Sequence, residues 1–125
     1  MWMAWDLAAD GSATHERPFY DATGDVGDAN PGLPDGLAVD SDGNLFATGP
    51  GGVLVFAPAE EGGEGIRLGT IRLPGPAANC TFGDDGRSLY ITSDAHLLRV
   101  RTRTRGSRHH DDPNLRESNG NPAAF

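Results

Sequence analysis

The sequence contains no lysine, and all ten of its basic residues are arginines, set against 18 acidic residues. The formal net charge of −8 at pH 7 is opposite in sign to the basic surface that nucleic-acid binding requires, so we expect no nucleic-acid partner. Cys80 is the single cysteine. No internal disulfide can therefore form, and a reducing compartment is the expected location.

Long apolar runs are also missing, since none approaches the roughly 18 residues of a membrane-spanning helix. The first ten residues, MWMAWDLAAD, lack the basic start and the apolar core of a secretory signal. We therefore expect a cytoplasmic protein with no membrane partner. No window of about 11 or more residues keeps a period near 3.6, which predicts essentially no helix.

Glycine and proline are abundant instead, with 18 and 9 of the 125 residues. Glycine alone is about twice its usual share of about 7%, which favours many short strands joined by tight turns. Six apolar runs between turn residues are predicted strands: Met1–Leu7, Ala13–Tyr20, Gly36–Val39, Leu45–Thr48, Gly52–Phe56 and Ile66–Leu73.

The second half of the chain repeats the first. DGLAVDSDGNLFAT begins at Asp35 and NCTFGDDGRSLYIT begins at Asn79, an offset of 79 − 35 = 44 residues. Each copy contains an apolar strand, an Asp-Gly turn, a second apolar strand, a small loop and a third strand, and the first copy adds a fourth. Four short strands in about 40–50 residues are typical of one blade of a β-propeller.

We therefore predict an all-β fold, a little over two four-stranded antiparallel blades of a six-bladed β-propeller, within residues 1–105. It comprises the end of one blade, a full blade at 35–73 and most of a last blade at 79–101. A closed propeller needs at least about four blades, so we expect an incomplete chain, with a small open β-sheet domain as the alternative. Residues 106–125 are polar and aperiodic, which predicts a disordered tail.

Two segments, PDGLAVDSDGNL at Pro34–Leu45 and PAANCTFG at Pro76–Gly83, resemble the senescence marker protein/gluconolactonase (regucalcin-like) family. The likeness runs from Met1 to about Arg103 and covers the C-terminal third of the family pattern. It implies a six-bladed propeller that hydrolyses sugar lactones with one divalent metal. The predicted function is the C-terminal fragment of such a metal-dependent lactone hydrolase. A non-catalytic propeller fragment or interaction module is the alternative.

The resemblance also implies a metal ligand. In the family the metal is held by a Glu, an Asn and the Asp of the Pro-Asp-Gly segment, and only that Asp maps onto this sequence, at Asp35. Oxygen ligands suit Ca²⁺, the expected ion, with Zn²⁺, Mg²⁺ and Mn²⁺ as alternatives. Such a metal would polarise the lactone carbonyl for attack by water, and Asp35 could also act as general base. The alternative for Asp35 is an Asx turn before a strand.

Asn79 holds the position of Asp35 one repeat later, so we expect it to contact the sugar lactone, with a strand-initiating turn residue as the alternative. Cys80 is expected in the core rather than as a nucleophile. Four further aspartates are expected in hairpin turns and not in a calcium loop, because the pattern of an EF-hand is incomplete: Asp40, Asp42, Asp84 and Asp85.

The remaining charged segments are interpreted as solvated. Arg99, Arg101, Arg103 and Arg105 alternate, so they would share one solvent-facing side if the last strand continues through them. His109–Asp112 falls in the predicted tail. Because the family's Glu and Asn ligands would lie upstream of Met1, the isolated chain is predicted to be inactive. The sequence leaves the oligomeric state undetermined.

Overall fold

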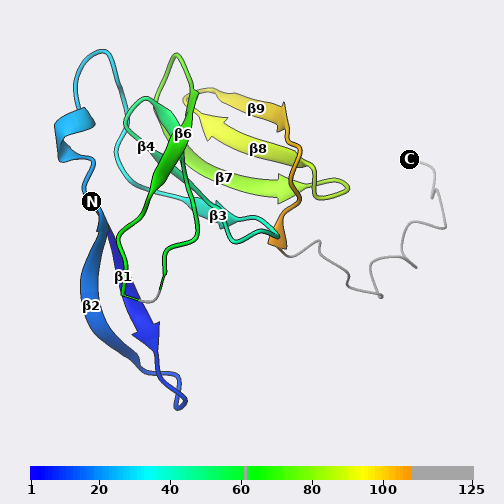
Figure 1. The fold of residues 1–125 in the computed structure, drawn as a ribbon. Coiled ribbons are helices and arrows are strands. Elements are labelled where there is room, and N and C mark those ends of the chain that lie inside the picture. Colours follow the sequence, from blue (N-terminus) through cyan, green and yellow to red (C-terminus); the bar gives the residue numbers. More distant parts are fainter. Residues whose placement is uncertain (61, 108–125) are drawn as a thin grey trace.

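Figure 1 shows the computed structural model of the chain, which describes residues 1–60 and 62–107 as three antiparallel β-sheets. The strands are β1 (Trp2–Leu7), β2 (Ala13–Tyr20), β3 (Leu37–Val39), β4 (Leu45–Gly49), β5 (Gly52–Phe56), β6 (Arg67–Arg72), β7 (Ala77–Gly83), β8 (Ser88–Ser93) and β9 (His96–Arg101). Within residues 1–60 and 62–106 helical structure is limited to the 3₁₀ turn η1 (Thr23–Asp25), in agreement with the prediction of essentially no helix. No helix in this part of the chain is long and apolar enough to cross a membrane.

The sheets follow the order that the sequence repeat predicts. β1 and β2 form a two-stranded sheet, β3 to β6 form a four-stranded sheet in sequence order, and β7 to β9 form a three-stranded sheet in the same order. Neighbouring strands are also neighbours in sequence, so each sheet is an antiparallel meander. The predicted strand boundaries agree with the structure to within one residue at Leu45–Gly49 and at Arg67–Arg72.

Aspartate–glycine turns close the first hairpin of both repeats. The Asp40 carboxylate accepts hydrogen bonds from the backbone N–H of Asp42 at 2.9 Å and of Asn44 at 2.7 Å. Asp85 accepts one from the backbone N–H of Arg87 at 3.0 Å. The glycine of each turn has a positive φ, 82° at Gly43 and 81° at Gly86, which costs glycine little. The prediction of hairpin turns at these aspartates is confirmed.

The four-stranded sheet is covered on both faces, because its strands carry apolar residues on both sides. One core lies between this sheet and the β7–β9 sheet, and the other lies between it and the β1–β2 sheet. The first core contains Phe46, Val53, Ala77, Cys80, Phe82, Leu89 and Ile91. The second contains Trp2, Ala22, Ala47, Leu54 and Phe56. This face-to-face stacking of sheets resembles the packing of successive propeller blades.

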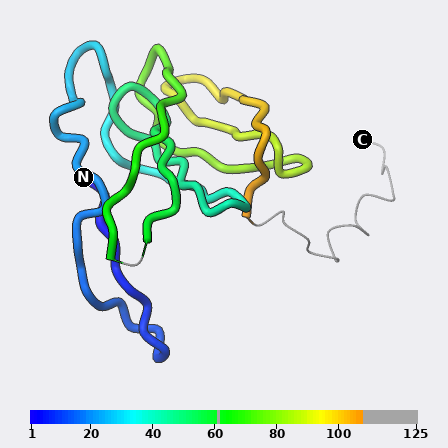
Figure 2. The backbone as a smooth tube through the Cα atoms, in the orientation of Figure 1, coloured from blue at the N-terminus to red at the C-terminus, as the bar shows by residue number. Residues whose placement is uncertain are grey.

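A segment after β9, residues 102–106, which we call the strap, leaves the last sheet and crosses to the middle one. Figure 2 shows the backbone turning from the end of β9 toward the turn that follows β3. Ser41 N–H donates to the Arg105 carbonyl at 2.7 Å, and Gly106 N–H donates to the Gly86 carbonyl at 2.9 Å. The strap therefore joins the β3–β4 turn to the β7–β8 turn, two turns that belong to neighbouring sheets.

The predicted disordered tail lies outside the described residues except for its first two. Of these, Gly106 is buried and forms a bridge with Asp40. For residues 108–125, which include His109–Asp112, the prediction stays a prediction.

Candidate functional site

The first strands of the two repeats, β3 and β7, begin side by side. Gly36 N–H donates to the Ala78 carbonyl at 3.0 Å. The buried Thr48 hydroxyl lies 3.0 Å from the Gly36 carbonyl and 3.3 Å from the Ala78 carbonyl, to which it can donate. Thr48 thus fastens the start of β3 to the start of β7, and it fixes the spacing of the residues next to them.

Glycine at position 36 is what permits this approach. A Cβ at Gly36 would lie 2.8 Å from the Cα of Asn79, closer than real Cβ contacts, and would also collide with the Asn79 amide. The Pro-Asp-Gly segment therefore places its glycine against the next repeat. Asp35 and Asn79, the two predicted site residues, are brought to the same end of adjacent inner strands.

Asp35 is exposed and differs from the turn aspartates. Asp10, Asp21, Asp40 and Asp85 each accept a hydrogen bond from the backbone N–H two residues later. The Asp35 carboxylate makes no such bond and has no side-chain or backbone partner within residues 1–60 and 62–107. The Asx-turn alternative is therefore not what the structure has, and among the described residues nothing bonds to the carboxylate that stands at the start of β3.

Asn79 is also exposed, but its amide oxygen is engaged. The oxygen accepts a hydrogen bond from the backbone N–H of Cys80 at 2.8 Å. The residue lies within β7, beside a register irregularity between Ala77 and Asn79, whereas Asp35 precedes β3. The two residues therefore share an end of the strands without sharing a register. The turn-residue alternative for Asn79 does not hold, because the residue is part of the strand.

A cleft of about 420 Å³ runs along the inner strands. It is lined by Leu37, Ala38, Val39, Asn79, Cys80, Thr81, Phe82, Gly106 and Ser107. Asn79 lines this cleft. Asp35 precedes the first residue of β3 and is not among the lining residues. The sequence reasoning missed Thr81 and Ser107 as lining residues, although Thr81 follows Asn79 by two positions and so shares its side of the strand.

Cys80 is buried on the opposite face of β7. Its thiol contacts the Phe46 carbonyl at 3.4 Å, and burial raises the pKa of the thiol to about 11. The group is therefore protonated at neutral pH and is a poor nucleophile. The prediction of a core cysteine is confirmed.

The arginine series does not extend along one strand, because β9 ends at Arg101. Arg99 pairs with Asp84 at 2.9 Å, and Arg101 pairs with Asp85 at 3.0 Å. All four side chains are substantially exposed, so these ion pairs form a solvated face. Arg103 and Arg105 lie in the strap.

The donor groups described here do not complete a metal site. Residues 1–60 and 62–107 contain no group of three or more His, Cys, Asp or Glu side chains arranged to hold an ion. Asp35 supplies a single free carboxylate, and the amide oxygen of Asn79 is already bonded to its own strand. One oxygen ligand falls short of the six to eight that Ca²⁺ takes.

Comparison with known proteins gives consistent results. Residues 1–95 match the sequence profile of the family described as the SMP-30/gluconolactonase/LRE-like region. A gluconolactonase from Zymomonas mobilis is 48% identical over 77 residues, which are 60% of this chain and 20% of that protein. The chain thus spans about a fifth of that relative.

Two solved structures are similar to the fold. A gluconolactonase from Xanthomonas campestris superimposes with a TM-score of 0.60 and 34% identity over 79% of this chain and 28% of its own. A luciferin-regenerating enzyme superimposes with a TM-score of 0.64 and 24% identity over 83% and 38%. Both have propeller-type folds, so the predicted fold class, part of a β-propeller, is confirmed.

Proposed function

Because the chain belongs to the SMP-30/gluconolactonase/LRE-like family, we propose that it forms part of a sugar lactone hydrolase and supplies Asp35 to its site. The observation that carries the proposal is the exposed Asp35 carboxylate, which has no hydrogen-bond partner in the described part of the chain and lies beside the junction of Gly36, Thr48 and Ala78. A side chain at the start of an innermost blade strand faces the propeller axis, where residues from distant blades meet. The sugar lactone substrate is inferred from the gluconolactonases that the chain resembles.

The proposed reaction is the addition of water to the lactone carbonyl and cleavage of the ring C–O bond, which yields a hydroxy acid. Asp35 would provide one oxygen ligand to a divalent cation, with Ca²⁺ expected and Zn²⁺, Mg²⁺ or Mn²⁺ as alternatives. Such an ion polarises a bound carbonyl. Alternatively, Asp35 would accept the proton of the attacking water. The Asn79 side-chain NH₂ would donate to a sugar hydroxyl in the cleft, because the amide oxygen is already bonded.

The 125-residue chain alone is expected to be inactive. The described residues would supply one ligand, Asp35, and the cleft among them is lined by β3, β7, Gly106 and Ser107. We predict no hydrolysis of D-glucono-1,5-lactone above the spontaneous rate and only weak stabilisation by Ca²⁺. Rapid hydrolysis by the purified chain that is lost in Asp35→Ala would contradict this incomplete-site proposal.

A chimera tests the role of Asp35. Residues 1–107 would replace the part of the Xanthomonas campestris gluconolactonase that superimposes on them. The chimera should hydrolyse the lactone, and Asp35→Asn should lower kcat/KM by about 100-fold or more, the scale of a lost acid–base or ligand group. The matched control is Asp42→Asn, an exposed turn aspartate. Equal activity of the two variants would show that Asp35 has no role in the hydrolysis.

The second candidate is a propeller part with no catalytic role, acting as an interaction module. It is favoured by the lack of a metal-binding group among the described residues and by the chain's coverage of 20% of one gluconolactonase. An inactive chimera that folds and binds no Ca²⁺ would select this candidate over the hydrolase.

A further inference from the structure

The two strands that line the cleft differ in polarity. β3 contributes Leu37 and Val39, which are 53% and 39% exposed and share one side of the strand because they are two positions apart. β7 contributes Asn79 and Thr81, which are also two positions apart and lie in regular pairing with β8. The cleft therefore presents an apolar side from β3 and a polar side from β7.

The polar groups of the cleft retain hydrogen-bonding capacity. Within residues 1–60 and 62–107 the Asn79 NH₂ and the Ser107 hydroxyl have no hydrogen-bond partner. The Thr81 hydroxyl makes one long contact, 3.5 Å to the Phe82 carbonyl. Thr81 lies two residues, about 7 Å, farther along β7 than Asn79. Groups at this spacing can meet several hydroxyls of one small ligand.

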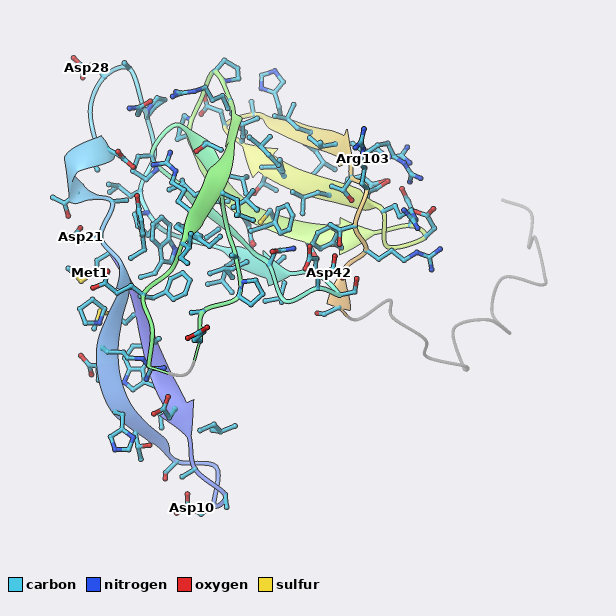
Figure 3. The ribbon with its side chains drawn as sticks, in the orientation of Figure 1. Met1, Asp10, Asp21, Asp28, Asp42 and Arg103 are labelled. Carbon is cyan, nitrogen blue, oxygen red and sulfur yellow. The ribbon has the colours of Figure 1, made fainter. Side chains whose placement is uncertain are left out.

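The strap forms one end of the cleft. Figure 3 shows it running from Arg103 toward the turn that contains Asp42. Gly106 is buried against Phe82, which leaves no room for a Cβ, and its N–H donates to the Gly86 carbonyl at 2.9 Å. These contacts hold the strap backbone against β7 and fix the position of the residue that follows it.

The two ends of the cleft differ in the groups they offer. Asp35 precedes β3 at one end, beside the hydrogen bond from Gly36 to Ala78. Ser107 lies at the other end, where the strap joins the turns that follow β3 and β7. A ligand whose carbonyl reaches Asp35 would therefore extend along β7 toward Ser107.

We propose that Thr81 and Ser107 determine the substrate specificity of the site. They hydrogen-bond the hydroxyls of a sugar lactone that lie farthest from its carbonyl, while Leu37 and Val39 pack on the C–H groups of its ring. The substrate class is a lactone with several hydroxyl groups. The cleft volume of about 420 Å³ is within the range of small-molecule sites. The inference rests on the proposed function, which supplies the position of the carbonyl.

The physical reason for the specificity is the cost of an unpaired polar group. A hydroxyl that loses its water to a bound ligand, without a bond in return, is left with its desolvation penalty. A lactone ring without hydroxyls would impose this cost at Thr81 and Ser107, whereas a hydroxylated ring would pair both. Sites that hydrogen-bond a substrate hydroxyl strongly reject analogues that lack it.

Binding to the full 125-residue chain is measured by amide NMR titration. The probes are 1,5-anhydro-D-glucitol, a hydroxylated ring that cannot be hydrolysed, and tetrahydropyran, the same ring without hydroxyls. The first should shift the amides of Thr81, Gly106 and Ser107, and the second should not. Thr81→Val and Ser107→Ala should each weaken binding about three- to tenfold, the worth of one hydrogen bond. The matched control is Thr14→Val on β2, whose hydroxyl lies 3.3 Å from the Asp6 carbonyl, and it should bind as wild type does.

The chimera with the Xanthomonas campestris gluconolactonase gives a second readout. Its kcat/KM for D-glucono-1,5-lactone is divided by that for δ-valerolactone, the same ring without hydroxyls. This ratio should fall about tenfold in Thr81→Val. A residue with only a structural role would lower both values together and leave the ratio unchanged.

Two outcomes would overturn the specificity assignment: no amide shifts at the cleft of the full chain, or a ratio that Thr81→Val leaves unchanged. Amide spectra of the variants that match wild type outside the cleft separate lost binding from lost folding. Binding at the cleft with an inactive chimera would leave the assignment standing and count against the proposed role of Asp35. An active chimera with an unchanged ratio would do the reverse.

Discussion

Gly36 is the residue on which the geometry of the candidate site depends most. Its N–H bonds to Ala78, and the space of its missing Cβ is taken by Asn79. Gly36→Ala forces the backbone of Asn79 to move, so it should lower the free energy of unfolding by about 1–3 kcal/mol, the usual cost of overpacking. Denaturant unfolding measures this cost. Gly69→Ala is the control, because a Cβ at Gly69 meets nothing within 4 Å; an equal loss in both variants would contradict the account.

Asp85 makes the free energy of unfolding depend on pH. The hydrogen bond from the Arg101 guanidinium, and then that from the Arg87 backbone N–H, lowers the pKa of the Asp85 carboxyl from 3.8 to about 2. The folded protein therefore favours the ionised Asp85 carboxylate over the protonated form. This carboxylate stabilises the fold above pH 3.8, and the stabilisation is lost as the pH falls toward 2.

Other carboxyl groups of the protein also change charge in acid. The comparison of wild type with Asp85→Asn therefore isolates the contribution of Asp85 to the pH dependence of stability. The difference in free energy of unfolding between the two proteins should shrink as the pH falls from about 4 to 2. Arg101→Gln should reduce the same pH dependence. A difference that stays constant over this range would show that the pair with Arg101 does not form in solution.

Residue roles that depend on local pattern could be predicted from the sequence. The turn aspartates and the core position of Cys80 follow from Asp-Gly spacing and strand alternation, and the structure has both. The engaged amide oxygen of Asn79 could not be predicted, because it depends on a register irregularity in β7. The alternation pattern gives no signal for such a shift.

The strap is the element whose removal should loosen the junction between sheets. Gly106 packs against Phe82, and a Cβ there would lie 2.7 Å from the Phe82 Cγ. Gly106→Val should displace the strap and lower the free energy of unfolding by about 1–3 kcal/mol. Amide exchange at Ser41 and Gly106, whose N–H groups bond across this junction, should accelerate.

Exchange at the Gly36 amide serves as the internal reference, because it lies at the other end of the same inner strands. Acceleration at Ser41 and Gly106 with little change at Gly36 is the expected pattern. Equal acceleration at the amides of Ser41, Gly106 and Gly36 would mean that the variant unfolds globally. The strap would then not stabilise the junction between the two sheets independently of the rest of the fold.

Strands were predictable where apolar runs stand between turn residues, as at β5 and β7. The strap could not be predicted from the sequence. Its residues, Thr102–Gly106, carry no large apolar side chain, and their partners are backbone groups of two distant turns. Contacts between backbone atoms of such a polar segment give no signal in hydrophobic periodicity.

For the whole molecule, the 44-residue repeat offset and the strand count predicted a propeller of stacked antiparallel blades, and the similar structures have that fold. What Asp35 binds does not follow from local pattern, because the described residues bring no group of three or more His, Cys, Asp or Glu side chains together. The structure leaves the Asp35 carboxylate without a hydrogen-bond partner among the described residues, and the proposed role as a metal ligand requires such a carboxylate.

The position of a bound cation relative to Asp35 tests this account most directly. A crystal structure of the Xanthomonas campestris chimera grown with Ca²⁺ should place an Asp35 carboxylate oxygen about 2.3–2.6 Å from the ion, the usual Ca²⁺–oxygen distance. The ion should lie at the end of β3 and β7 that Thr48 fastens. An ion bound elsewhere, with the Asp35 carboxylate hydrogen-bonded to its own turn, would contradict it.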